Sequence, residues 1–339
     1  MSRGNNGAMT RKPVMSDVAR LAGVSHQTVS RVINGASSIR PETRARVEHA
    51  IAQLGYRPNS VARALVTNRS GIIGIIGSST GQYGPSSIQR SVEESARAAG
   101  FFSSSVTLAA VTRQEIRGAL DHLSRLAVEA IVMIAAQQDA LNVVYAEDFG
   151  VPVIIVEGDL SGSGMSVGVD QVGAARVATQ HLIDLGHTDI AHVSGPDGWP
   201  EAHARTRGYL DAMLAARLSP RPELKGDWSA ARGYQLGRQI AENRSITAVF
   251  AANDHTAIGV LHALAEAGRR VPEDVSVIGF DDIPEAPYLI PALTTIRQDF
   301  AAVGHQAIAM VQARLAGTEC SIDLLPSDLI VRDSTSALR

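Results

Sequence analysis

The sequence has little of several features that would each indicate a particular class of protein. It holds a single cysteine, Cys320, which excludes an internal disulfide, a thiolate zinc cluster and a redox pair of cysteines. Its longest apolar runs, such as 72–76 and 131–136, are far shorter than the roughly 20 residues that a membrane-spanning helix needs. Residues 1–10 are polar and lack the apolar segment of a secretory signal. We therefore expect a cytoplasmic protein that does not contact a membrane.

Motifs of enzymes and cofactor sites are also scarce. Residues 71–78 are glycine-rich, but they form neither a G-x-G-x-x-G fingerprint nor a Gly-Lys-Ser/Thr phosphate loop, so no nucleotide site is expected. His181 and His187 are six residues apart, which differs from the i, i+4 pair of a zinc-binding helix. We expect neither an enzyme nor a metal or organic cofactor. The adjacent Asp281 and Asp282, together with the ten histidines, leave acid–base chemistry as an alternative.

The net charge of −3 hides a strong division along the chain. Residues 1–69 contain eleven basic and three acidic side chains, a balance of +8, so the remainder carries −11. A basic block of this kind is either a surface that binds phosphate groups or merely a solvated face. The pattern of apolar residues has to decide between the two.

The basic segment has the pattern of three short helices. The first is expected over 16–23, with Ser16 as the candidate N-cap and Gly23 as the stop. The second is expected over 25–35, and the third over 41–54 with proline in its first turn. Two short helices joined by a tight turn are typical of a helix-turn-helix, although an unrelated small helical bundle would look similar.

The second of these helices would be the one that reads DNA. Ser25 can cap it, and its outward side chains, His26, Gln27, Ser30 and Arg31, can all hydrogen-bond to base edges in the major groove. Residues 58–70 follow as a brief helix-competent stretch that is too short to be stable alone. Its Leu65 would suit an apolar wedge in the minor groove.

From residue 71 onward, short β-rich runs alternate with helical stretches. The expected strands cover 72–76, 103–108, 130–134, 153–156, 190–193, 248–251 and 275–280. This alternation predicts parallel sheets with helices on both faces, so the expected fold is an all-α head followed by an α/β body of two doubly wound lobes. Ligands of such folds bind in a crevice at the carboxyl ends of the strands.

Polar and aromatic residues that follow the predicted strands are candidates for that crevice. They are Glu157, Asp170, Asn253, Asp254, Asp281, Asp282 and Gln298, joined by Arg205, Trp228 and Phe300. Carboxylates, amides and a guanidinium group can bind neighbouring hydroxyls of a sugar, and an aromatic ring can cover the apolar face of a pyranose. Each of them alone is explained equally well as a helix cap, a turn residue or a core residue.

The run from Met15 to Asn34 resembles the lactose repressor family of bacterial transcriptional regulators. The likeness continues through Gly55-Tyr56-Arg57-Pro58-Asn59 and 62–65, and then along nearly the whole chain. It implies that DNA is contacted by Ser16, Ser25, His26, Gln27, Thr28, Ser30, Arg31, Asn34, Asn59, Ala62 and Leu65. His26, Gln27 and Arg31 would read bases, and Leu65 would enter the centre of the operator.

The body resembles the sugar-binding core that this family shares with periplasmic sugar-binding proteins, in motifs such as Gly279-Phe280-Asp281-Asp282 and 293–300. The implied ligand-binding residues are Pro85, Ser87, Ile88, Glu157, Glu201, Arg205, Trp228, Asn253, Asp281, Gln298 and Phe300. A β-galactoside is suggested as the effector. Glu157 and Glu201 stand where the lactose-binding pattern has aspartate and serine, which makes a related glycoside the alternative.

The resemblance also implies how the chain is divided and what it does. The expected parts are a disordered tail (1–12), a helix-turn-helix domain (13–57), a hinge helix and linker (58–70) and an effector-binding body (71–335), with an N-lobe of 71–169 and 300–327 and a C-lobe of 170–299 and 328–335. The C-terminus lacks the leucine heptads of a tetramer-forming helix, so a homodimer is expected. The implied function is repression of carbohydrate-utilisation genes, relieved when a sugar binds between the lobes. An enzyme and a free-standing sugar-binding protein are the rival classes.

Overall fold

The computed structural model describes residues 13–33, 36, 38–56, 69–78, 81–134, 149–157, 166–318 and 324–338. It separates into two compact units, which we call the head (1–70) and the body (71–339). None of the described helices is long and apolar enough to cross a membrane.

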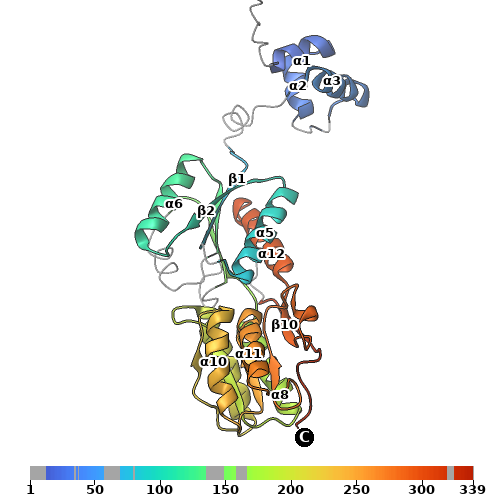
Figure 1. Ribbon diagram of the computed structural model, residues 1–339. Helices are drawn as coiled ribbons and strands as arrows, with labels where there is room; N and C mark the ends of the chain where they lie inside the picture. The colour runs from blue at the N-terminus through green and yellow to red at the C-terminus, as the bar shows by residue number, and fades with distance from the viewer. Residues whose placement is uncertain are drawn as a thin grey trace, which may run out of the picture. The chain divides into compact units, whose positions relative to one another are not determined.

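The head consists of three helices, α1 (Met15–Ala22), α2 (His26–Ile33) and α3 (Pro41–Leu54) (Figure 1). They enclose a small core in which Val18, Val29 and Val47 are fully buried. Glycine ends α1 and α3, because Gly23 and Gly55 adopt φ values of +62° and +61° that other residues rarely tolerate. The expected helix-turn-helix, formed by α1 and α2, is therefore present.

The start of the first helix differs from the expected one. Ser16 lies inside α1 and does not cap it, because the chain becomes helical one residue earlier. The Asp17 carboxylate accepts the backbone N–H of Val14 at 3.0 Å and so fixes the start of the helix there. Ser25 does cap α2, since its Oγ accepts the backbone N–H of Thr28 at 3.1 Å.

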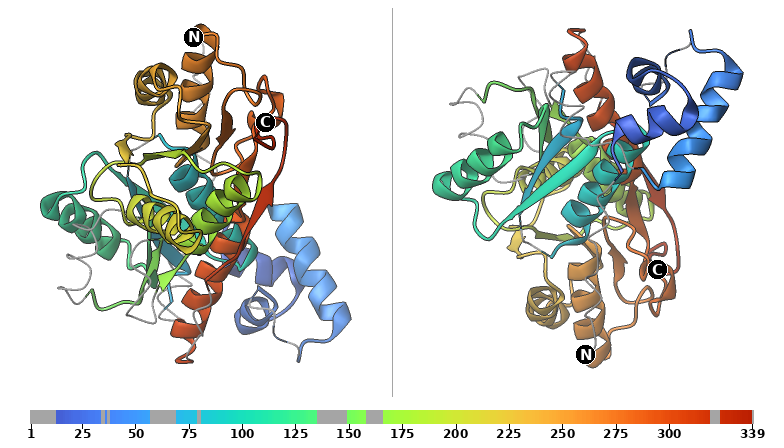
Figure 2. Two further views of the ribbon diagram at one scale, coloured as in Figure 1. Left: turned by 90° about the horizontal axis from the view of Figure 1, so that it is seen from below. Right: turned by 90° about the horizontal axis from the view of Figure 1, so that it is seen from above.

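The N-lobe of the body is built on a parallel five-stranded sheet in the order β2-β1-β3-β4-β5. Its strands are β1 (Ile72–Ser78), β2 (Phe102–Leu108), β3 (Ala130–Ile134), β4 (Val153–Val156) and β5 (Ser166–Val167), and its helices are α5 (Tyr83–Ala98), α6 (Arg113–Arg125) and α12 (Phe300–Leu315). In β1, Ile73 and Ile75 pack with α5 and α12, whereas Ile76 packs with α6 on the other face. The alternation of a strand thus gives the sheet two apolar faces, both covered by helices (Figure 1 and Figure 2).

The C-lobe repeats this plan with a parallel four-stranded sheet in the order β7-β6-β8-β9. Its strands are β6 (Ile190–Ser194), β7 (Leu224–Lys225), β8 (Ala248–Ala251) and β9 (Ser276–Ile278), and its helices are α8 (Gln171–Asp184), α9 (Pro200–Ala215), α10 (Ala230–Glu242) and α11 (Asp254–Glu266). Val249 packs with α10 and α11, and the neighbouring Phe250 packs with α8 and α9. The expected pair of doubly wound lobes is confirmed.

Two antiparallel strands, β10 (Thr295–Gln298) and β11 (Ser327–Ile330), lie where the chain passes between the lobes. A bridge from Asp281 to Arg297 joins β10 to the C-lobe, while α12, which follows directly, packs on the N-lobe sheet. The chain therefore crosses after β5, after β10 and before β11.

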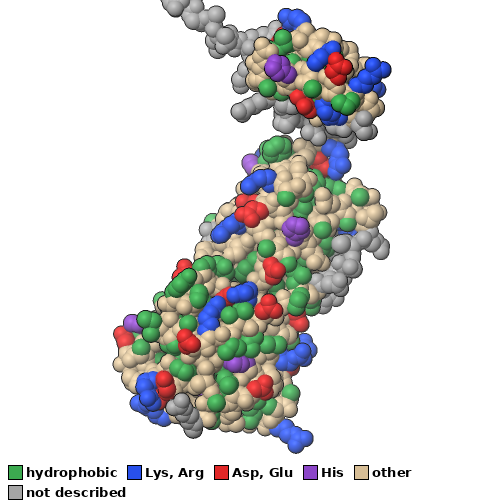
Figure 3. Space-filling model, turned by 90° about the vertical axis from the view of Figure 1, so that its right-hand side faces the viewer, with side chains coloured by type: hydrophobic (Ala, Val, Ile, Leu, Met, Phe, Trp, Pro, Cys, Tyr) green, Lys and Arg blue, Asp and Glu red, His purple; other side chains and the backbone are tan. Residues whose placement is uncertain are grey.

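The sequence of the head is predominantly basic, whereas the body carries side chains of both charges. On the face shown in Figure 3, its basic and acidic side chains are interspersed. A continuous basic surface is what a phosphate backbone requires, so this face of the body does not have the character of a DNA-binding surface.

Candidate functional site

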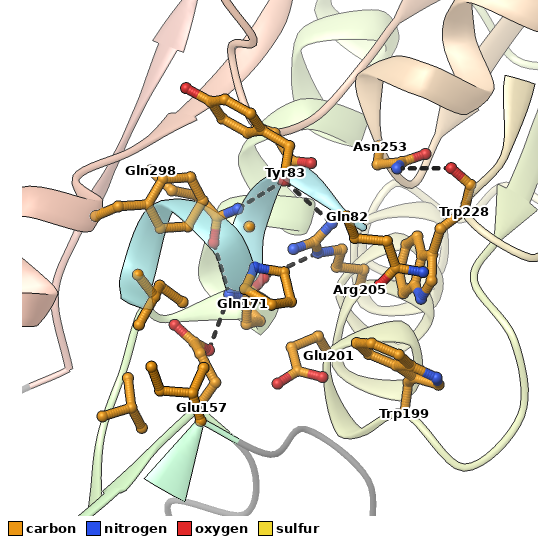
Figure 4. A pocket seen from close by; sticks show the side chains of 17 residues that line it. Gln82, Tyr83, Glu157, Gln171, Trp199, Glu201, Arg205, Trp228, Asn253 and Gln298 are labelled. Carbon is orange, nitrogen blue, oxygen red and sulfur yellow. Dashed lines mark hydrogen bonds and ion pairs between the residues drawn. The ribbon is translucent and has the colours of Figure 1, made fainter. Parts of the chain in front are cut away.

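One cavity lies between the two lobes, at the carboxyl ends of strands and the first turns of helices. It is lined by Gln82, Tyr83, Gly84, Pro85, Ile88, Ile134, Val156, Glu157, Gln171, Trp199, Glu201, Arg205, Trp228, Asn253, Asp281, Gln298 and Phe300 (Figure 4). The space between the lining atoms amounts to about 570 Å³, including the part that is open to solvent. Its position is that of a small-molecule site in an α/β protein.

Four of the lining side chains form a closed ring of polar contacts (Figure 4). Gln171 accepts a hydrogen bond from Arg205 Nε at 2.9 Å and donates to Gln298 Oε1 at 2.8 Å. Gln298 in turn donates to Asp281 Oδ1 at 2.7 Å, and Asp281 lies 3.6 Å from Arg205 Nη1. Gln171 also donates to Glu157 at 3.2 Å, which links the ring to the end of β4 in the N-lobe. The ring holds these side chains in fixed orientations.

Arg205 is the buried cation of the cavity. Its guanidinium lies 3.8 Å from the centre of the Phe280 ring and 5.4 Å from that of Trp228, and it donates to the carbonyl of Ala252. Burial lowers the pKa of Arg205, and the nearby Asp281 acts in the opposite direction. Such a paired and stacked guanidinium keeps its charge in a site from which water is largely excluded.

Two carboxyl groups of the cavity hold protons more tightly than usual. Burial raises the pKa of Glu157 to about 7, against the opposing effect of its hydrogen bonds from Val169 and Gln171. Burial likewise raises the pKa of Asp281 to about 6, while Arg205 and Gln298 act to lower it. Both groups therefore titrate in the range where cellular pH lies, and both can accept hydrogen bonds when ionised.

Aromatic rings form the apolar part of the wall. Trp199 and Trp228 meet edge to face, with ring centres 5.9 Å apart, and Tyr83 and Phe300 do so at 5.8 Å. Asn253 holds the Trp228 backbone by donating from its side chain to the Trp228 carbonyl at 3.1 Å. Flat apolar rings beside fixed hydrogen-bonding groups are the combination that binds a sugar ring.

Three of the six described non-glycine residues with positive φ line the cavity. Glu157, Trp228 and Asp281 have φ values of +59°, +70° and +114°, a region that non-glycine residues rarely occupy. All three side chains line the cavity. Strain of this kind persists where the surrounding structure holds a residue for a function other than stability.

The structure brings together nearly all the residues that the sequence suggested for ligand binding. Pro85, Ile88, Glu157, Glu201, Arg205, Trp228, Asn253, Asp281, Gln298 and Phe300 all line the cavity. Ser87 is not among the lining residues, although it lies on the same helix as Pro85 and Ile88. That these residues bind a ligand stays a prediction.

Three acidic candidates have structural roles instead. Asp170 caps α8 by accepting the backbone N–H of Gly173, and Asp254 accepts hydrogen bonds from Thr295 and Ile283. Asp282 pairs with Arg297 and Arg332. These contacts account for the three side chains as cap or packing residues without a ligand.

Several lining residues were not foreseen, among them Gln82, Tyr83, Gln171 and Trp199. Gln171 directly follows Asp170, a residue that the sequence did single out, and Trp199 precedes the proline that opens α9. Both lie near the start of a helix that follows a strand, β5 for Gln171 and β6 for Trp199, so position after a strand was the signal that could have found them. No described lining residue is a histidine. His192, for example, is stacked between Tyr209 and Phe250, and burial lowers its pKa to about 4.

The residues suggested for DNA contact lie at the helix-turn-helix. Ser16, Ser25, His26, Gln27 and Arg31 are exposed, and Thr28 and Ser30 are half-buried. Their positions on or beside α2 are those from which side chains reach base edges. Asn34, Asn59, Ala62 and Leu65 lie outside the described residues, as does the expected hinge except for Arg69 and Ser70.

Comparison with known proteins gives a consistent result for both units. Residues 14–59 match the family model "Bacterial regulatory proteins, lacI family", and residues 179–335 match "Periplasmic binding protein-like domain". The chain is 35% identical to the lactose operon repressor of Escherichia coli K12 over 334 residues, which covers 96% of this chain and 92% of that protein.

Solved structures extend the likeness to three dimensions. The lac repressor dimer bound to operator and the anti-inducer ONPF is similar with a TM-score of 0.84 and 33% identity, over 96% of this chain and all of that one. The complex of the transcriptional regulator CelR with cellobiose gives a TM-score of 0.71 and 31% identity, over 95% of this chain and 99% of that one. The helix-turn-helix, the two-lobed body and these matches together show that the chain belongs to the lacI family of bacterial regulatory proteins.

Proposed function

We propose that the chain is a transcriptional repressor of carbohydrate-utilisation genes, which leaves its operator when a sugar binds the cavity between the lobes. The sugar is a β-galactoside or a related glycoside. The protein acts in the cytoplasm, where its DNA lies, and binds DNA as a homodimer. One observation carries the proposal: a cavity with a fixed ring of sugar-binding polar groups and two tryptophans occurs in a chain that begins with a helix-turn-helix.

The exposed side chains of α2 support the DNA-binding part. Arg31 suits the two acceptors of guanine and Gln27 suits adenine, and both are exposed on the helix that would enter the major groove. Contacts from the basic head to phosphates would supply affinity without sequence preference. Specific recognition then depends on His26, Gln27 and Arg31.

The wall of the cavity supports the sugar-binding part. Gln171, Asp281 and Arg205 present amide, carboxylate and guanidinium groups in fixed positions, and Trp228 offers an apolar face. Two related structures contain a small ligand, cellobiose with CelR and the anti-inducer ONPF with the lac repressor. Because the wall is drawn from both lobes, a ligand that contacts both would favour one relative arrangement of the lobes over another.

A mobility-shift assay tests the proposal directly. The probe is DNA from upstream of the gene for this chain, with the protein alone or with lactose, cellobiose or methyl β-D-galactoside. We expect a specific shifted band and at least a tenfold loss of DNA affinity with one of these sugars. Because its guanidinium is a member of the ring, bonded to Gln171 and 3.6 Å from Asp281, replacing Arg205 by alanine should abolish the sugar response while DNA binding remains.

A matched control lies two residues away on the same helix. The Arg207 side chain is 76% exposed and makes one weak pair with Asp211, so Arg207→Ala should keep the full sugar response. If Arg205→Ala also kept it, the cavity would not be the effector site. If the wild type failed to shift any upstream DNA, the repressor function itself would be wrong.

A further inference from the structure

The cavity wall carries more negative than positive side chains. Glu157, Glu201 and Asp281 are its carboxyl groups, and Arg205 is the only basic side chain among the described residues that line it. With every group ionised, the formal balance would be −2. A wall of this composition binds charged and uncharged ligands with different affinities, because electrostatic attraction and repulsion are strong where water is excluded.

The positive charge of Arg205 is already offset by carboxyl groups of the wall. Its Nε–H is bonded to Gln171, its Nη1 donates to the Ala252 carbonyl, and Asp281 lies 3.6 Å away. Aromatic rings cover its faces, at 3.8 Å for Phe280 and 5.4 Å for Trp228. Asp281, Glu201 and Glu157 all act on Arg205, so one positive charge faces three carboxyl groups of the wall.

The two glutamates are placed to accept hydrogen bonds from a ligand. Each carboxylate oxygen of Glu157 receives one hydrogen bond at 3.2 Å, from the Val169 backbone and from Gln171, and a carboxylate oxygen can accept a second. Glu201 lies in the first turn of α9 and is 7% exposed. The positive end of a helix stabilises a carboxylate at this position. In the view of Figure 4, Glu201 is seen between Glu157 and Trp199.

We propose that Glu157 and Glu201 make the cavity selective for uncharged glycosides rich in hydroxyl donors, with Glu201 as the residue that rejects anionic sugars. This inference rests on the proposed function, because it specifies which sugars the cavity accepts. A hydroxymethyl group donates a hydrogen bond to a carboxylate, whereas a ligand carboxylate at the same place is repelled by it. Uronic acids and sugar phosphates are therefore excluded, while neutral glycosides bind.

Pairs of sugars that differ in one group test the selectivity on the full-length wild-type protein. We would measure, by titration calorimetry, binding of p-nitrophenyl β-D-glucopyranoside against its glucuronide, and of p-nitrophenyl β-D-galactopyranoside against its galacturonide. Within each pair the ligands differ only at C6, where a hydroxymethyl donor is replaced by a charged carboxylate. The acid should bind at least tenfold more weakly than its neutral partner. An acid that bound as tightly as its partner would overturn the inference and leave the sugar-responsive function intact.

A substitution tests whether Glu201 provides the selectivity. Glu201→Gln keeps the shape of the side chain and removes its charge, so the ratio of affinities for the neutral and acidic partners should fall at least threefold. Glu266→Gln, an exposed carboxyl on α11 outside the cavity wall, should leave the ratio unchanged. Equal ratios in Glu201→Gln and wild type would remove Glu201 from the proposal. If no sugar of the panel bound, nor lactose or cellobiose, the proposed effector class would fail and the selectivity with it.

Discussion

Asp281 and Asp282 are neighbours in the chain, yet their carboxyl groups have different partners and different roles. Asp281 is bonded to Gln298 within the cavity, whereas Asp282 holds Arg297 and Arg332 on the crossover strands. The sequence indicated both as candidates, because both follow a strand. The pair also has positive φ values, +114° and +53°, so the chain turns where the two side chains diverge. A positive φ cannot be predicted from the residue type at positions where a non-glycine residue stands, because such residues rarely adopt it.

Glu157 should make the stability of the protein depend on pH. Its pKa is raised by burial from 4.5 to about 7, so the folded chain holds a proton in this range that the unfolded chain has lost. Stability therefore falls as pH rises from about 4.5 to 7 and stays lower above that. Glu157→Gln should remove this fall, which is of the order of 3 kcal/mol for such a shift. Thermal unfolding of both proteins at pH 5 and pH 8 measures it.

The control for this experiment is a carboxyl with a shift in the other direction. Asp274 is half-buried, and its hydrogen bonds from Arg270 lower its pKa, so it stays ionised throughout the range from pH 5 to pH 8. Asp274→Asn should leave the difference in stability between these two pH values as it is in the wild type. An equal pH dependence in Glu157→Gln and wild type would show that Glu157 is not the responsible group.

Gly195 should be required for the position of the Trp228 ring. A Cβ at residue 195 would lie 2.2 Å from Cζ2 of Trp228 and 2.3 Å from Cη2, so the ring would have to move. We expect Gly195→Ala to weaken sugar binding at least tenfold and to leave DNA binding of the free protein unchanged. Calorimetry and the mobility-shift assay measure the two properties. Gly118→Ala is the matched control, since a Cβ there meets nothing within 4 Å.

At the scale of elements, the three helices of the head and seven strands of the body were predictable, and four strands were not. All seven expected strands are present, with β3, β4 and β8 at the expected residues, because each has a continuous apolar run of four or five buried positions. Two of the unexpected strands, β5 and β7, have only two residues and thus no measurable period. The other two, β10 and β11, pair antiparallel where the chain crosses between the lobes. Each forms a strand because the other provides its hydrogen-bonding partner.

The α2 helix allows folding to be separated from DNA recognition. The Ser25 hydroxyl caps the helix, whereas Gln27 is exposed. Ser25→Ala should lower the stability of the head by about 1 kcal/mol, as loss of a serine cap does in other helices. Gln27→Ala should leave the stability unchanged and reduce operator affinity at least tenfold. Thermal unfolding and mobility shift would show the two effects, and a Gln27→Ala protein with wild-type operator affinity would contradict the assigned role.

At the scale of the whole molecule, the two-lobed fold could be predicted, but the hydrogen-bond network of the cavity could not. Strand–helix alternation and the family motifs indicated two parallel sheets with a site between them. The hydrogen bond from Gln171 to Gln298 joins residues 127 positions apart, and neither residue type is unusual at a helix start or a strand end. Such a contact depends on the packing of both lobes, which is why Gln171 was missed while its neighbour Asp170 was singled out.

The proposed dimer gives a prediction at this scale. Light scattering of the purified full-length chain should give twice the 35.8 kDa of one chain, and the mass should not rise to four times that value at higher concentration. Two heads are needed for two half-sites about one helical turn of DNA apart. A mass of one chain at concentrations where the operator is bound would rule out the symmetric arrangement.

The ring around Gln171 also bears on how the ligand preference of this scaffold could be re-engineered. Both donor hydrogens and the carbonyl of the Gln171 amide are used, by Glu157, Gln298 and Arg205, so a replacement here would leave several buried polar groups unsatisfied at once. Glu201 and Trp199 border the same cavity outside that ring. A biosensor library for new sugars is therefore best randomised at Glu201 and Trp199, with the Gln171 ring kept as the fixed frame.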